Sequence, residues 1–99
     1  MAKLEDLQRC TGFDWDDGNQ GKNWPKHKVS DTESEEIFFN DPLITGVDFK
    51  HSGSEPRFVA LGQTDSERLL FVVFTIRKDL IRVISARGMT TREIRRYQS

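Results

Sequence analysis

Arginine dominates the cations of the second half of the sequence and suggests contact with phosphate or carboxylate groups. Residues 57–99 contain 9 Lys and Arg residues, and all of them except Lys78 are Arg. The rigid guanidinium fork matches phosphates and carboxylates with paired hydrogen bonds. The candidate phosphate ligands stand near the ends of apolar runs and are Arg57, Arg77, Arg82 and Arg87. The alternative is that these arginines only end strands, reach water or pair with acidic residues.

The charge of the chain is divided unevenly between its halves. Residues 1–56 hold 6 Lys and Arg against 12 Asp and Glu, a net charge of −6, whereas residues 57–99 hold 9 against 4, a net charge of +5. Such a division indicates either a nucleic-acid face on an otherwise acidic protein or an acidic segment packed on a basic one. A solvated surface of mixed charge is equally compatible with these counts.

Several side chains are suited to proton transfer, namely His27, His51, Glu55, Glu93 and Tyr97. His27 follows Lys26 at a predicted helix end, where the helix dipole favours an imidazolium. It can act as an acid or contact phosphate, or it can simply bond loose helix carbonyls. His51 and Glu55 belong to a polar loop beside Arg57, and a solvated loop is the simpler interpretation.

No metal or other cofactor is expected from the sequence. The two histidines stand 24 positions apart, and Cys10 is the single cysteine. This spacing does not match a zinc site. A lone cysteine forms no internal disulfide, which favours a reducing cytoplasm. The longest apolar run, residues 69–74, is too short to span a bilayer, so no membrane contact is expected.

The length of 99 residues predicts a single domain, and the apolar pattern predicts its sheet. Three runs rich in Val, Ile, Leu and Phe lie within residues 57–87 and are separated by polar loops of about four residues, which is typical of an antiparallel meander. Residues 43–49 are a possible edge strand, and residues 13–15 a second short strand. The prediction is therefore a small antiparallel sheet made of the three-stranded meander plus one or two edge strands.

Helix signals flank this sheet on both sides. Asp16 or Asp17 can cap a first helix that runs to His27. Ser30 and Glu33 form a capping box for a second helix, over residues 31–40. Thr90 and Glu93 form another capping box, which opens a short C-terminal helix ending at Tyr97. Two N-terminal helices, the sheet and one short C-terminal helix make an α+β domain.

Strand alternation distributes the candidate arginines over two faces. Four-residue loops place Thr64 opposite Leu69 and Ile76 opposite Ile81. Arg57 and Arg87 then share one face at opposite ends, whereas Arg77 and Arg82 lie on the other face with Thr75. The four groups can converge only if a bulge or a strong twist changes this register. The face of Thr75, Arg77 and Arg82 is therefore one candidate binding surface, and the end of Arg87 near the C-terminal helix is the other.

The order of these segments resembles that of the BrnT-like toxins of bacterial toxin–antitoxin systems. The resemblance rests on FDWD, NWPKHKVS, DP, HSGSEPRFVALGQT, VVFT and RVISAR, followed by a last helix with Glu93 and Tyr97, and covers residues 13 to 97. It implies a RelE-like fold, with residues 1–12 as an N-terminal extension of a single domain at residues 13–99. It also implies cleavage of RNA without a metal, inhibition of translation and neutralisation by a DNA-binding antitoxin.

The resemblance leads to a specific expectation of activity and partners. The chain is expected to be a cytoplasmic endoribonuclease that uses the 2′-hydroxyl of RNA as the nucleophile. The expected catalytic residues are Arg57, Arg77, Arg87, His27, Glu93 and Tyr97, and the expected substrate-binding residues are Lys26, Arg82, Thr75 and His51. The expected partner is a BrnA-like antitoxin in a 2:2 complex, through which alone operator DNA is bound. The alternative is a non-catalytic module whose basic half docks an acidic protein.

Overall fold

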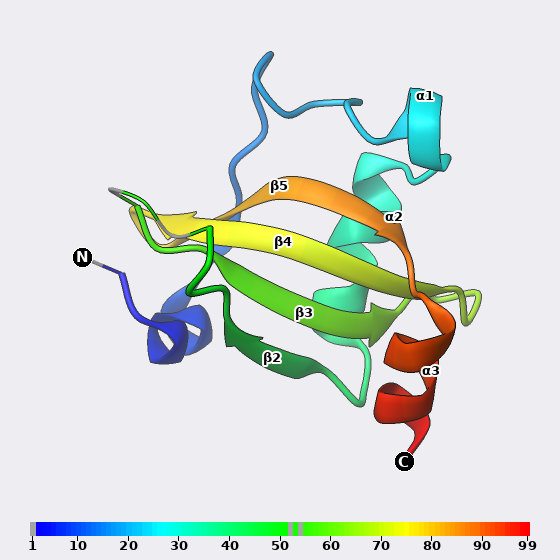
Figure 1. Ribbon diagram of the computed structural model, residues 1–99. Helices are drawn as coiled ribbons and strands as arrows, with labels where there is room; N and C mark the ends of the chain where they lie inside the picture. Colours follow the sequence, from blue (N-terminus) through cyan, green and yellow to red (C-terminus); the bar gives the residue numbers. More distant parts are fainter. Residues whose placement is uncertain (1, 52, 54) are drawn as a thin grey trace.

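The computed structural model describes residues 2–51, 53 and 55–99 and is built around a five-stranded sheet (Figure 1). The strands are β1 (Gly12–Phe13), β2 (Ile44–Val47), β3 (Phe58–Gln63), β4 (Leu69–Arg77) and β5 (Leu80–Gly88), in the spatial order β1-β5-β4-β3-β2. Strands β3, β4 and β5 form the predicted antiparallel meander, and β2 pairs with β3 as the predicted edge strand. The α+β class is therefore confirmed.

The sheet is larger than the meander, and the prediction that it is wholly antiparallel is wrong. Strand β1 pairs with β5 in parallel, so the sheet is mixed. Backbone hydrogen bonds from Thr11 N to Asp79 O and from Asp14 N to Ile81 O, both 2.9 Å, attach this segment to the edge of β5. The edge of the meander is thereby covered by the N-terminal chain, which satisfies backbone groups that would otherwise be unpaired.

Two of the predicted helices are confirmed with their caps. Helix α2 (Asp31–Glu36) continues into the 3-10 turn η2 (Ile37–Phe39), and α3 is Thr91–Gln98. Ser30 Oγ accepts from Glu33 N at 3.1 Å, and Thr90 Oγ1 accepts from Glu93 N at 3.2 Å. The N-terminal segment adds the 3-10 helix η1 (Leu4–Arg9). None of the helices in the described part of the chain is long and apolar enough to cross a membrane.

The predicted helix from Asp16 or Asp17 to His27 is wrong, because only its last turn is helical. That turn is α1 (Trp24–His27), and residues 17–23 form turns instead. Asn19 donates its side-chain amide to the carbonyls of Asp14 at 2.9 Å and Val83 at 3.1 Å, and Gly21 adopts a φ of 67°. These side-chain bonds offer the backbone an alternative to the helical ladder.

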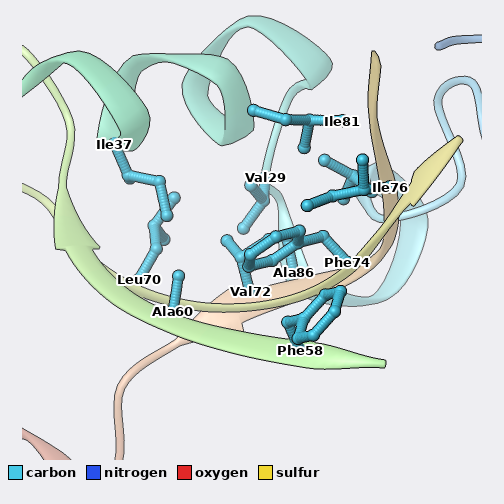
Figure 2. Close-up of a cluster of buried hydrophobic side chains, with 11 residues drawn as sticks. Val29, Ile37, Phe58, Ala60, Leu70, Val72, Phe74, Ile76, Ile81 and Ala86 are labelled. Atoms are coloured by element: carbon cyan, nitrogen blue, oxygen red, sulfur yellow. The ribbon is translucent and has the colours of Figure 1, made fainter. Parts of the chain in front are cut away.

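One face of the sheet is covered by α2 and η2, and the core lies between them. Figure 1 shows α2 behind the strands, and Figure 2 shows the buried side chains between this helix and the curved sheet. The core residues are Val29, Ile37, Phe58, Ala60, Leu70, Val72, Phe74, Ile76, Ile81, Val83 and Ala86. The opposite side of the sheet is called the open face below.

The register of the meander differs from the prediction at two points. Leu69 pairs with Gln63 and not with Thr64, whereas the predicted pairing of Ile76 with Ile81 is confirmed. Pairing of Val73 with Ser85 and of Phe74 with Val83 leaves Ile84 as an extra residue, which makes a β-bulge in β5. A shift of one residue moves every side chain of a strand to the other face.

The corrected register places all four candidate arginines on the open face. Arg82 pairs with Thr75, and Arg87 pairs with Phe71, on the side of β4 that faces away from Val72 and Phe74. Arg77 follows Thr75 by two residues, and Arg57 directly precedes the buried Phe58, so strand alternation places both on this side. The expected division of these arginines between two faces is therefore wrong.

Candidate functional site

One end of the open face carries a group of three arginines around Thr75, called here the guanidinium cluster: Arg57, Arg77 and Arg82. Hydrogen bonding by Arg77 lowers the pKa of Glu55 most, and the charges of Arg82 and Arg57 also lower it, so all three cations act on one carboxylate. Thr75 is only 1% exposed and donates to the carbonyl of Pro56 at 2.7 Å. Thr75 therefore holds the segment that leads into β3, and its hydroxyl is engaged within the fold.

Two members of the cluster hold carboxylates with both arms of the guanidinium fork. Arg77 donates from Nε and Nη2 to Glu55 at 2.6 and 2.9 Å. Arg82 donates from Nη1 and Nη2 to Asp16 at 3.0 and 2.9 Å, and Asp14 lies 3.5 Å from the same group. Hydrogen bonding by Arg82 lowers the pKa of Asp16. Each carboxylate thus fills a guanidinium fork, and the geometry of such a fork also matches a phosphate.

Burial within these pairs is unequal. The Arg82 side chain is 13% exposed, whereas that of its partner Asp16 is 58% exposed. Arg77 and Glu55 are both at the surface. Arg82 is therefore held in place by the sheet with Asp16 on its solvent side, whereas Arg77 and Glu55 form an exposed pair.

The other end of the open face is formed by Arg87 and helix α3. Arg87 donates to both carboxylate oxygens of Glu93 at 2.8 and 3.0 Å, and its guanidinium carbon lies 4.2 Å from the centre of the Phe71 ring. Hydrogen bonding by Arg87 lowers the pKa of Glu93. The hydroxyl of the buried Tyr97 donates to the carbonyl of Pro42 at 2.6 Å, and burial raises its pKa. Tyr97 therefore anchors α3 beside the sheet.

A cleft of about 270 Å³ separates α3 from the strands and is called here the α3 cleft. Its floor and walls combine apolar residues of the sheet with charged residues of the helix. The lining residues are Ile44, Thr45, Gly46, Val59, Leu61, Phe71, Arg92, Glu93 and Arg96. The sequence analysis did not select Gly46, Phe71, Arg92 or Arg96 as site residues. Phe71 lies within an apolar strand, and this position gave no signal of a site.

The predicted residues Lys26 and His27 lie on α1, apart from the guanidinium cluster. The carbonyls of His27 and Lys28 accept hydrogen bonds from Arg68 at 3.1 and 2.6 Å, and Arg68 also donates to Glu33. Lys26 is exposed, and His27 is half-buried. Arg68 therefore ties the end of α1 to the β3–β4 hairpin.

His51 lies in the β2–β3 loop, which borders the guanidinium cluster. The Nδ1 atom of His51 is 3.1 Å from the carboxylate of Asp48, and the amide of Asp48 donates to the carbonyl of Arg57 at 2.8 Å. Among the predicted proton-transfer groups, the fold thus brings Glu55 to the cluster and Glu93 to Arg87, and it holds His51 against Asp48 in the bordering loop. His27 and Tyr97 are held elsewhere.

Carboxylates that contact the arginines were also missed as site residues. Asp14 and Asp16 alternate with Phe13 and Trp15, and this alternation was the available signal that they share one side of the chain. Among residues 2–51, 53 and 55–99, no group of three or more His, Cys, Asp or Glu side chains is arranged to hold a metal ion.

Comparison with known proteins identifies the family. A family model described as the ribonuclease toxin, BrnT, of type II toxin–antitoxin systems matches residues 15–93, which is most of the chain. A search of curated proteins found no match. The description names a ribonuclease, whose target is RNA. It also names a toxin of a toxin–antitoxin system, whose partner is a cognate antitoxin. The chain belongs to the BrnT family of ribonuclease toxins of type II toxin–antitoxin systems.

Proposed function

We propose that this chain is an endoribonuclease toxin of RelE-like fold. It cleaves RNA without a metal and uses the 2′-hydroxyl of the RNA as the nucleophile. The 2′-hydroxyl loses its proton to a general base as its oxygen attacks the adjacent phosphorus, the bond to the 5′-oxygen breaks, and a general acid delivers a proton to that leaving oxygen. The products are a 2′,3′-cyclic phosphate and a 5′-hydroxyl end. The observation that carries the proposal is the gathering of Arg57, Arg77, Arg82 and Arg87 on the open face.

The guanidinium cluster supplies the positive charge that this reaction needs. One well-placed donor at a developing charge is worth on the order of 2–4 kcal/mol of the barrier. Arg77 and Arg82 already present the two-armed geometry that fits a phosphate, with Glu55 and Asp16 in its place. Surface ion pairs contribute little to stability, so an RNA phosphate displaces these carboxylates at small cost.

Other predicted residues take complementary roles in this proposal. His51 acts at the cluster as a contact for the RNA or its transferred proton, supported by its place in the bordering loop. Glu93 acts with Arg87 at the other end of the open face. Lys26 and His27 contact the RNA where it extends beyond the sheet. Thr75 orients the segment of Pro56 that precedes Arg57, and Tyr97 positions α3.

The biological setting is proposed from the family. The antitoxin is a BrnA-like DNA-binding protein in a 2:2 complex, operator DNA is bound through the antitoxin alone, and the toxin acts in the cytoplasm by inhibiting translation. Residues 13–99 carry the activity, and residues 1–12 are an N-terminal extension. The family match, which begins at residue 15, supports this division.

The test is cleavage of a labelled single-stranded RNA by purified protein in the presence of EDTA. We expect products with 5′-hydroxyl ends, and no cleavage at a nucleotide whose 2′-hydroxyl is replaced by hydrogen. Arg77→Ala and Arg82→Ala are expected to lower the rate by about 10²-fold or more. The matched control is Arg9→Ala, which removes an exposed arginine on η1. This variant protein should cleave the RNA at the wild-type rate.

Three results would contradict the proposal. Cleavage that requires an added divalent ion would remove the metal-free mechanism. Cleavage that survives at the deoxy position would remove the 2′-hydroxyl as nucleophile. Intact RNA under all conditions, together with tight binding of an acidic protein partner, would favour the non-catalytic docking module.

A further inference from the structure

The α3 cleft is an apolar site on the same face of the sheet as the guanidinium cluster. Its floor is made by Val59, Leu61 and Phe71, and Arg92 and Arg96 of α3 stand at its side. Phe71 and Thr75 are on the same side of β4 and are four residues apart, which is about 13 Å along the strand. A single-stranded RNA bound at the cluster can therefore extend along the sheet to this cleft.

Gly46 determines how much room the cleft has. It lies in β2 opposite Val59, and a Cβ atom added at Gly46 would lie 3.7 Å from Cγ2 of Val59, inside the cleft. The φ angle of Gly46 is not in the left-handed region, so the backbone of β2 does not require glycine there. A glycine within a strand often marks a place where a ligand approaches the backbone closely. The absent side chain therefore leaves space above the apolar floor.

We propose that the α3 cleft binds one unpaired nucleobase of the RNA and so determines which nucleotide lies near the cleaved phosphate. This inference rests on the proposed ribonuclease function. The volume of about 270 Å³ lies just below the range of about 300–1,000 Å³ typical of sites for drug-sized ligands, which suits one flat heterocycle. Apolar contact with the base, and the charges of Arg92 and Arg96 near the flanking phosphates, provide the binding.

A peptide of the antitoxin is the competing occupant, and the geometry favours the base. An amphipathic helix needs a groove long enough for anchors spaced over two turns, whereas this cleft holds only about 270 Å³ and has α3 as one wall. Arg82 and Arg87 lie on the open face of β5, and the cleft on the same face is itself lined by Arg92 and Arg96. A polyanion with bases as side groups matches both features.

The experiment fills the cleft without touching the arginines. Gly46→Leu is compared with Val47→Leu, which lies next to it on β2 but outside the cleft lining. Cleavage of an RNA of mixed sequence is mapped at nucleotide resolution. In Gly46→Leu we expect the rate at the preferred nucleotide to fall about 10- to 200-fold relative to the other positions, since the added side chain excludes the base. Val47→Leu should keep the wild-type pattern.

A second measurement does not depend on catalysis. Each of the four nucleoside 5′-monophosphates is titrated while the methyl resonances of Val59 and Leu61 are followed by NMR. One of the four monophosphates is expected to shift these methyl resonances most in the wild type. The smaller substitution Gly46→Ala adds only an ordinary van der Waals contact with Val59 and should weaken this response. This binding can be observed even if the wild-type protein cleaves no RNA, so a failure of the proposed function is distinguished from a failure of the inference.

The inference is overturned by an unchanged cleavage pattern in a folded Gly46→Leu protein, whether the overall rate is kept or falls uniformly. It is also overturned if the methyl resonances respond to none of the four monophosphates. An unchanged pattern combined with weaker neutralisation by the antitoxin would assign the cleft to the antitoxin instead.

Discussion

The guanidinium group of Arg87 holds the carboxylate of Glu93 through two hydrogen bonds of 2.8 and 3.0 Å, and this contact joins strand β5 to the first turn of helix α3. The same carboxylate accepts from the backbone amide of Thr90 at 2.9 Å, so one side chain caps the helix and attaches it to the sheet. This contact therefore couples the start of helix α3 to the sheet and to one wall of the α3 cleft.

Glu93→Gln should lower the free energy of unfolding by about 1 kcal/mol at about pH 7, because charge-assisted hydrogen bonds to Arg87 are weakened. The pKa of Glu93 in the folded protein is lowered from its ordinary value of 4.5. The stabilisation is therefore complete above 4.5 and is lost as the pH falls through the lowered value. Denaturant unfolding across this range should show the two proteins converging at low pH. A difference that stays constant with pH would contradict the role of the ion pair.

Glu55→Gln should increase the affinity for RNA. The substitution removes the carboxylate that occupies the fork of Arg77, which leaves this cation available to a phosphate. The expected gain is about two- to fivefold, the strength of an exposed ion pair. Binding is measured by fluorescence anisotropy with a 2′-O-methyl RNA, which is not cleaved by 2′-hydroxyl attack. Glu5→Gln on η1 makes the same change in net charge at an exposed position and should have little effect. Equal gains in both variants would show that only net charge matters.

Gly62→Ala should destabilise the fold by about 1–3 kcal/mol. A Cβ atom at Gly62 would lie 2.8 Å from Cβ of Ile37 and 3.3 Å from its carbonyl oxygen, so β3 and η2 would have to separate. Gly88→Ala is the matched control, because nothing lies within 4 Å of the added atom. Thermal unfolding of the two variants should place Gly62→Ala well below the control. Similar midpoints would mean that η2 moves away from the sheet without cost.

Replacing Lys78 and Asp79 by Asn and Gly should stabilise the β4–β5 hairpin. These two residues form the turn, with backbone φ angles of 52° and 61°. Residues other than Gly and Asn adopt such positive φ angles at a cost in free energy. Asn-Gly is strongly preferred in two-residue turns of this type. The expected increase in unfolding free energy is about 1 kcal/mol, measured by urea denaturation. A double variant that is less stable than the wild type would indicate that the charges of Lys78 and Asp79 matter more than the backbone.

Much of the architecture followed from local sequence patterns. The meander, the edge strand β2, both capping boxes and the C-terminal helix depend on interactions between residues close in the chain, and such signals are readable without coordinates. The candidate arginines and the resemblance to the BrnT family could also be recognised from residue types and their order. By contrast, the turn at residues 17–23 was missed, because the Asn19 side chain bonds to Val83, which is distant in the sequence.

The sequence by itself determined the α+β composition, the family and the supply of guanidinium groups. The tertiary structure alone decided that these groups share one face, because a one-residue change in the β3–β4 register and a bulge at Ile84 reverse the predicted sides. It also decided which carboxylates hold Arg77, Arg82 and Arg87, and that a cleft opens beside α3. Strand register and long-range ion pairs depend on how distant segments pack, and alternating patterns of similar apolar residues do not distinguish neighbouring registers.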